Sequence, residues 1–235
     1  MGSDAATEPY LDLPRRTTAP GAAVLVLHGG KAASLDPVEP SQLTVRRMQP
    51  FVRDLAALDD DIAVAQIRYR YRGWNDAEAH PVADVEFALD AIGARYGPVP
   101  VVMVGHSMGG RAALRAAGHP SVTGVVALAP WLPGAEPVAP VAGRDLVVLH
   151  GTRDATTSPD ASLRFVERAA PLARRVACLR VPRSGHGMVL RAGLWQRLTS
   201  GFVAAIVAGA SFAPVLGAAR AARCRDCTTH PDPNR

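Results

Sequence analysis

The sequence is poor in cysteine, lysine and aromatic residues, and each shortage argues against a class of protein. The 235 residues include three cysteines, which are too few for the disulfide framework of a small secreted domain. Lysine occurs once, at Lys31, so the net charge of +5 comes from arginine. Aromatic residues make up 5% of the chain and are not interleaved with a dense basic run, so we expect no nucleic-acid partner.

The sequence also shows no pattern typical of segments that direct a protein to a membrane. Its N-terminus, MGSDAATEPYLDLPRR, has no charged region followed by an apolar one, so we predict no signal peptide and a cytoplasmic location. The uncharged stretch 201–219 approaches the length of a membrane span, but it is rich in Ala and Gly and is interrupted by Pro214. We interpret it as a buried terminal helix followed by a loose tail, and we expect no membrane partner.

The C-terminal motif CRDCTTH contains three residue types that bind metals. Cys224, Cys227 and His230 have a spacing that metal ligands can adopt, but a fourth ligand is missing and the segment is terminal. An exposed, oxidisable cysteine pair is the favoured interpretation, and we predict no metal site.

Short valine-rich runs alternate with longer amphipathic segments along the chain. The runs have the uncharged centres of strands buried in a parallel sheet, at 22–27, 62–69, 99–104, 122–127, 145–149 and 175–181. Helices are expected at 41–58, 81–96, 108–117, 158–170 and 188–209. This order predicts an α/β fold, with a mostly parallel, doubly wound sheet and helices on both faces.

The same pattern predicts one domain. We expect an N-terminal extension over 1–20, a single domain over 21–210 and a flexible C-terminal tail over 211–235. The segment 130–144, between the fourth and fifth strands, is too short to hold an inserted cap domain.

The stretch VVMVGHSMGG places one serine between a strand and a helix. Gly105 and Gly109 flank Ser107 in the pattern G-x-S-x-G, whose glycines permit a strained turn that lifts the serine oxygen clear of the sheet. A serine at this position can also act only as a helix cap. The rest of the chain has to decide between a nucleophile and a cap.

A serine nucleophile needs a base and an acid that orients the base, and candidates for both follow later strands. Asp154 lies in the loop after the fifth strand, whereas Asp145 lies at the opposite end of that strand and Asp160 lies in the next helix. His186 follows the sixth strand between two glycines. The order Ser107, Asp154, His186 is the order of a catalytic triad on such a sheet.

An anionic intermediate would also need hydrogen-bond donors. Gly30, in the loop LHGGKAAS after the first strand, and Met108, directly after the serine, are the expected backbone N–H donors. The loop has no phosphate-binding pattern G-x-x-x-x-G-K-[ST].

Taken together, the motifs HGG, GHSMGG, HGTRD and SGHG resemble those of the α/β-hydrolase superfamily, over about residues 22–209. The resemblance implies the α/β-hydrolase fold, with Ser107 as nucleophile, His186 as base and acid, Asp154 as its orienting partner, and Gly30 and Met108 as the oxyanion hole. Without a cap segment, the chain is similar to compact, lidless members, the dienelactone-hydrolase-like and small esterase groups. It lacks the cysteine nucleophile of dienelactone hydrolases proper.

The resemblance further implies a serine hydrolase that cleaves a small-molecule ester or thioester and needs no cofactor. The alternatives are a thioesterase or acyltransferase and a non-catalytic binding protein that keeps the fold. Trp74, Trp131 and Met188 are expected to contact the acyl chain, although the tryptophans could equally be packing residues.

Overall fold

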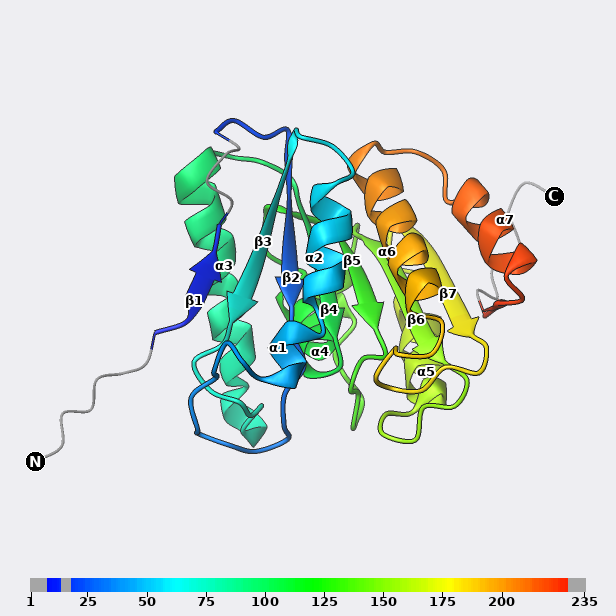
Figure 1. Cartoon of the computed structure of the whole chain (residues 1–235), viewed down its shortest axis with the longest axis horizontal. Helices are drawn as coiled ribbons and strands as arrows, with labels where there is room; N and C mark the ends of the chain where they lie inside the picture. The colour runs from blue at the N-terminus through cyan, green and yellow to red at the C-terminus, as the bar shows by residue number, and fades with distance from the viewer. Residues whose placement is uncertain (1–7, 14–17, 228–235) are drawn as a thin grey trace, which may run out of the picture.

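The computed structural model describes residues 8–13 and 18–227, which form a central sheet between two layers of helices (Figure 1). The strand order among these residues is β1-β3-β2-β4-β5-β6-β7-β8. In this order, the strands from β3 to β7 run parallel to their neighbours. At the two edges, β1 pairs antiparallel with β3 and β8 pairs antiparallel with β7. The strands are β1 (Tyr10–Asp12), β2 (Ala22–Leu27), β3 (Ile62–Arg68), β4 (Val101–His106), β5 (Val122–Leu128), β6 (Asp145–Gly151), β7 (Arg175–Val181) and β8 (Arg225–Asp226).

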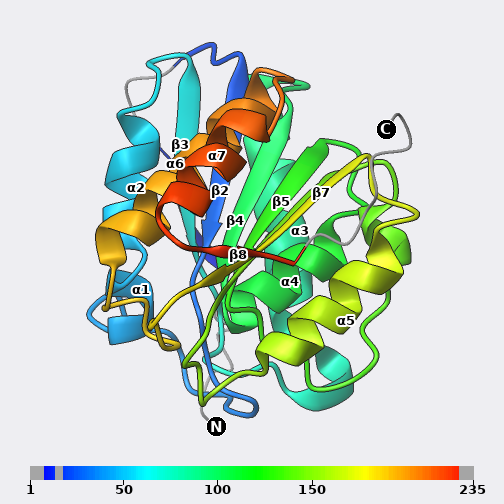
Figure 2. The same ribbon diagram turned by 90° about the vertical axis from the view of Figure 1, so that its right-hand side faces the viewer.

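Helices cover both faces of the sheet, as Figure 2 shows from the side. One layer holds α3 (His80–Tyr96), α4 (Met108–Ala116) and α5 (Pro159–Ala169). The other holds α1 (Leu43–Arg46), α2 (Gln49–Ala56), α6 (Ala192–Val207) and α7 (Ala213–Ala221). Two short 3₁₀ helices, η1 (Asp76–Glu78) and η2 (Ala139–Val141), lie in connections.

The apolar runs form strands because both of their faces are covered. In β2, Leu25 and Leu27 pack against the α3–α5 layer, while Val24 and Val26 pack against the α2–α6 layer. All four side chains are fully buried. This double burial explains the continuous apolar sequence, since a strand with one exposed face would alternate with polar residues.

The six predicted central strands are confirmed to within two residues at their ends. The helix expected at 41–58 is divided into α1 and α2, because Pro50 has no N–H to donate to the carbonyl of Arg46. The described chain contains no cap domain, since the connection 129–144 between β5 and β6 holds only η2.

The C-terminal segment differs from the expected loose tail. Residues 213–221 form α7, and β8 pairs antiparallel with β7. The segment is fixed by apolar burial, because Phe212 packs edge-on against Phe202 at 5.2 Å and Ala219 is fully buried. Within the N-terminal extension, β1 pairs with β3. Residues 1–7, 14–17 and 228–235, including His230, lie outside the described residues.

The two cysteines of the CRDCTTH motif lie on opposite sides of the sheet. Cys224 is buried in the α6–α7 layer, whereas Cys227 packs against the other layer and donates its N–H to the carbonyl of Cys178 at 2.8 Å. These two thiols therefore cannot share one metal ion. The described residues contain no group of three His, Cys, Asp or Glu side chains suited to a metal.

Within the described chain, no helix combines the length and apolar character that crossing a bilayer requires. The stretch 201–219 is divided between α6, which ends at Val207, and α7, which begins at Ala213.

Candidate active site

Ser107 occupies a sharp turn between β4 and α4. Its φ of 56° and ψ of −117° are strained for a residue with a side chain. The turn is also tight, because a Cβ on Gly109 would lie 2.5 Å from the carbonyl oxygen of His28. The side chain of Ser107 makes no helix-capping hydrogen bond. The cap interpretation is therefore not supported, and the hydroxyl is available to other groups.

His186 connects Ser107 to Asp154. Its Nε2 lies 3.0 Å from Ser107 Oγ, and its Nδ1 lies 2.8 Å from Asp154 Oδ2. Three residues that are far apart in the sequence thus form one hydrogen-bonded chain at the carboxyl edge of the sheet. Because the carboxylate accepts from Nδ1–H, Nε2 of the neutral ring is unprotonated and accepts the hydroxyl proton of Ser107.

The side chain of Asp154 is fully buried yet ionised. Its Oδ1 accepts from the backbone N–H groups of Thr156 at 2.8 Å and Thr157 at 2.9 Å, and its Oδ2 also accepts from Thr157 Oγ1 at 2.9 Å. Burial by itself raises the pKa of this carboxyl, but the hydrogen bonds from His150, His186 and these N–H groups outweigh burial and hold the pKa well below its usual range.

His150 and Thr157 are parts of the site that the sequence pattern did not identify. His150 Nε2 lies 3.2 Å from Asp154 Oδ2, and its Nδ1 lies 2.8 Å from Ser162 Oγ. The signal was present in HGTRD, where a histidine precedes the aspartate by four residues. The two other aspartates considered as the orienting acid form ion pairs with arginines instead. Asp145 pairs with Arg174 and Arg175, and Asp160 pairs with Arg180 at 2.6 Å.

Gly30 and Met108 lie side by side next to the serine. A Cβ on Gly30 would lie 2.6 Å from Met108 Sδ and 2.5 Å from the carbonyl oxygen of Arg72, so only glycine fits there. Among the described residues, neither the Gly30 N–H nor the Met108 N–H has an acceptor. Met108 opens α4, so its N–H lies at the positive end of the helix dipole.

Comparison with known proteins agrees with this fold. A family model described as serine aminopeptidase, S33, matches residues 28–144, which include the Gly30 loop and the serine turn but end before Asp154 and His186. No curated protein sequence matches the chain.

Solved structures align with most of the chain. Est1E from Butyrivibrio proteoclasticus, solved with ferulic acid bound, has a TM-score of 0.63 and 14% identity, and the alignment covers 86% of this chain and 95% of that one. The lidless serine hydrolase XC6422 from Xanthomonas campestris has a TM-score of 0.56 and 17% identity, covering 80% and 84%. The butyrate-bound thermophilic esterase Est2 from Thermogutta terrifontis has a TM-score of 0.62 and 15% identity, covering 84% and 88%.

The chain has the α/β-hydrolase fold. Within this fold, two buried histidines support the loops around Ser107. His28 Nδ1 donates to the carbonyl of Gly29 at 2.7 Å, and because C=O and N–H point opposite ways across a trans peptide, this bond fixes the direction of the Gly30 N–H. His106 Nε2 donates to the carbonyl of His186 at 3.0 Å, which holds the His186 loop against β4.

Because of these two histidines, we expect the protein to lose stability in mild acid. Burial lowers the pKa from 6.5 to about 4 for His28 and to about 3 for His106. Below pH 6.5 the unfolded chain therefore binds protons that the folded chain excludes. We expect the free energy of unfolding to fall by about 1.4 kcal/mol per pH unit for each histidine, between pH 6.5 and about 4. Asp154, whose pKa is depressed, contributes stability that is lost only at lower pH.

Urea unfolding at intervals from pH 7 to pH 4.5 measures this slope. Replacing His106 with glutamine is expected to remove its share of the slope, whereas His119→Gln, at a partly exposed histidine of the same chain, is the control for loss of a histidine. A slope that is unchanged in His106→Gln would show that His106 does not carry the effect.

Trp74 is a packing residue beside an arginine rather than the wall of a cleft, whereas Trp131 is partly exposed and its contact with substrate stays a prediction. Trp74 is 2% exposed, so it has no surface to offer a substrate. The guanidinium of Arg111 lies 3.8 Å from the ring centroid of Trp74 and 4.8 Å from that of Trp131, and it pairs with the buried Glu136 at 2.7 Å. The sequence offered no sign of this buried pair, whose partners lie 25 positions apart.

Two cavities adjoin the loops that carry His186 and Gly30. The His186-side cavity, of about 590 Å³, is lined by residues that include Leu43, Arg46, Arg47, Phe51, Met188 and Val189. The Gly30-side cavity, of about 210 Å³, is lined by residues that include His28, Gly30, Lys31, Val38, Leu43 and Arg72. Met188 lines the His186-side cavity and is 3% exposed, and its contact with an acyl chain stays a prediction.

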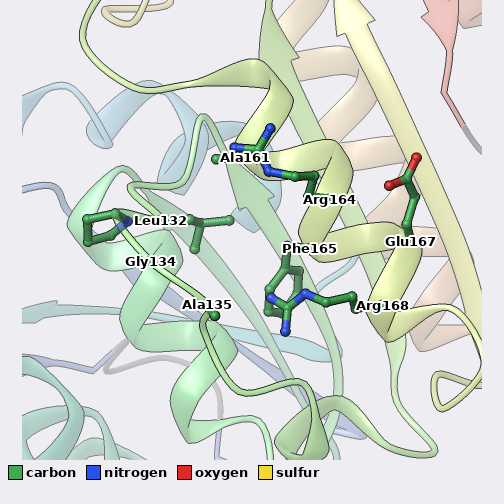
Figure 3. Close-up of a pocket in the computed structure, with 9 residues that line it drawn as sticks. Leu132, Gly134, Ala135, Ala161, Arg164, Phe165, Glu167 and Arg168 are labelled. Carbon is green, nitrogen blue, oxygen red and sulfur yellow. The ribbon is translucent and has the colours of Figure 1, made fainter.

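A third cavity lies away from these residues. It has a volume of about 420 Å³ and lies between the loop after β5 and helix α5, where Leu132 faces Arg164 and Phe165 (Figure 3). It shares no lining residue with the other two cavities.

Proposed function

We propose that this α/β hydrolase is a serine esterase that acts through an acyl-enzyme. Ser107 is the nucleophile, His186 is the general base and acid, and Asp154 orients His186. Gly30 and Met108 supply the N–H groups of the oxyanion hole. The observation that carries the proposal is the continuous chain of hydrogen bonds from Ser107 Oγ through His186 to Asp154, at 3.0 Å and 2.8 Å.

The chemistry follows from this geometry in two halves. His186 Nε2 takes the proton of Ser107 as Oγ attacks the ester carbonyl, and the resulting oxyanion accepts from Gly30 and Met108. His186 then gives the proton to the leaving alcohol, and an acyl-Ser107 ester remains. Water attacks that ester as His186 takes a proton from it, and the acid leaves as Ser107 regains its proton. Asp154 stays ionised throughout, and no cofactor takes part.

The charges around the site favour esters over peptides. An aminopeptidase has to bind the ammonium group of its substrate, and a carboxylate in the binding cavity would do this. The charged side chains that line the two cavities beside the triad are all cationic: Lys31, Arg46, Arg47 and Arg72. These residues would repel a peptide N-terminus.

Labelling and turnover together test the proposal. We expect a fluorophosphonate to label Ser107, as detected by peptide mass spectrometry, and we expect 4-nitrophenyl esters to be hydrolysed faster than aminoacyl 4-nitroanilides. Matched acetyl thioesters and an added alcohol acceptor distinguish thioesterase and acyltransferase activity from ester hydrolysis. A protein that is folded but neither labels nor turns over any of these substrates would be a non-catalytic member of the fold, and the proposal would be wrong.

The absence of a cap in the described chain predicts that no interfacial activation occurs. The loop after β2 is held to the loop after β3 by hydrogen bonds, including Gly73 N–H to Ser34 O at 3.0 Å and Arg72 N–H to Asp36 O at 2.9 Å, so it is not a free lid. The rate on a sparingly soluble ester should therefore rise smoothly through its solubility limit. A sharp jump in rate at the limit would mean that this segment opens.

A further inference from the structure

The cations beside the triad differ in whether they have a partner. Arg72 lies 3.8 Å from Asp36, but no carboxylate of the described residues lies within ion-pair distance of Arg47. Arg47 is nevertheless only partly exposed. Arg70, Arg111 and Arg175, which are also buried or partly buried, have close carboxylate partners. Arg68 and Arg144, which lack one, contact the ring of Tyr10 and backbone carbonyl oxygens instead. A cation that faces a cavity without such a partner can bind an anionic ligand.

Arg47 lies next to the residue that follows His186. A Cβ placed on Gly187 would be 3.6 Å from the Arg47 guanidinium carbon and 3.6 Å from one of its terminal nitrogens. Arg47, Gly187 and Met188 line the same cavity. The guanidinium therefore lies beside the loop that carries His186.

The chemistry of the reaction decides which half of the substrate occupies this cavity. His186 has to protonate the leaving oxygen, so the alcohol half of an ester lies on the His186 side of Ser107. The rest of the cavity is largely apolar and includes Leu43, Phe51 and Val189. An alcohol half that extended into this cavity would meet an apolar wall and a guanidinium.

We propose that the substrate is an ester whose alcohol half carries a carboxylate or phosphate group, and that Arg47 binds this anion in the His186-side cavity. The inference rests on the proposed esterase function. Arg47 is a substrate-binding residue, because its planar guanidinium can donate two parallel hydrogen bonds to a carboxylate or phosphate.

Matched acetate esters test this assignment. The substrates are 4-acetoxybenzoate, 4-acetoxyphenyl phosphate and the neutral 4-acetoxybenzamide, and kcat/KM is measured for each with the wild type and with Arg47→Gln. We expect Arg47→Gln to lower kcat/KM for at least one anionic ester by about 10- to 100-fold, mainly through KM, and to change the neutral ester by less than about threefold. Because each ester is compared between the wild type and the variant, differences in intrinsic reactivity between the esters do not affect the result. The carboxylate and phosphate substrates distinguish the two sources of the anion.

Two further variants separate local binding from general charge. Arg53→Gln removes the same charge from an exposed position on α2 that does not line the cavity, and it should leave the preference unchanged. Arg47→Lys keeps the charge and should retain part of the preference. Equal effects of Arg47→Gln on charged and neutral esters would overturn the assignment of Arg47 while leaving the esterase function intact. If the wild type hydrolyses none of the three esters and is not labelled by a fluorophosphonate, the proposed function fails, and the inference fails with it.

Discussion

Replacing Ser107 with alanine is expected to reduce kcat for ester hydrolysis by about 10⁴- to 10⁶-fold and to abolish fluorophosphonate labelling. The variant loses the oxygen that lies 3.0 Å from His186 Nε2 but keeps the Cβ and the turn. Any remaining rate would come from the oxyanion N–H groups acting on bound substrate. Steady-state kinetics and intact-protein mass after labelling measure the two effects. Full labelling of the variant would show that another residue is the nucleophile.

The stability of two variants at this position tests the strain in the turn. Ser107→Ala should unfold at nearly the wild-type temperature, because a φ of 56° is as unfavourable for alanine as for serine. Ser107→Gly should be inactive as well but more stable than Ser107→Ala, because glycine adopts a positive φ without the steric penalty, which for other residues is about 1 kcal/mol or more. Equal melting temperatures for the two variants would mean that the turn stores no strain.

The sequence allowed prediction of the features that depend on local pattern. Strand β2 was predicted with its observed ends, because its run AAVLVL is buried on both faces and contains no competing polar residue. Strand β7 was also predicted with its observed ends, although it carries Arg175 and Arg180. Ser107 was identified from its G-x-S-x-G turn, and Asp154 and His186 from their places after later strands, since parallel strands bring the loops after their carboxyl ends to one edge.

Features that depend on long-range contacts could not be predicted in this way. The burial of Trp74 depends on Arg111 and Glu136, which belong to other elements. The C-terminal α7 is only weakly amphipathic in sequence, and it is placed by burial of Phe212 and by pairing of β8 with β7. The proximity of Arg47 to Gly187 joins residues 140 positions apart and has no local signature.

The Asp154→Asn variant is expected to lose about 10⁴-fold in kcat, as when the orienting acid of a triad becomes an amide. Both carboxylate oxygens of Asp154 accept from donors: Oδ1 from two backbone N–H groups, and Oδ2 from His186 and Thr157. The side chain of an asparagine has to point its NH₂ group at one of these two sets of hydrogen-bond donors. If NH₂ takes the Oδ2 position, His186 has to accept at Nδ1 and carry its proton on Nε2, so it cannot take the proton of Ser107. If NH₂ takes the Oδ1 position, it meets the N–H groups of Thr156 and Thr157.

The matched control for Asp154 is the aspartate six positions later. Asp160 is an exposed residue that pairs with Arg180 at 2.6 Å and makes no contact with His186, so Asp160→Asn should change kcat by less than about twofold. Because the amide leaves buried donors unmatched in either orientation, Asp154→Asn should also melt at a lower temperature. Rates are therefore compared well below both melting temperatures, with the folded fraction measured by circular dichroism. A folded Asp154→Asn protein with near-wild-type kcat, or an equal loss of kcat in Asp160→Asn, would show that Asp154 does not orient His186.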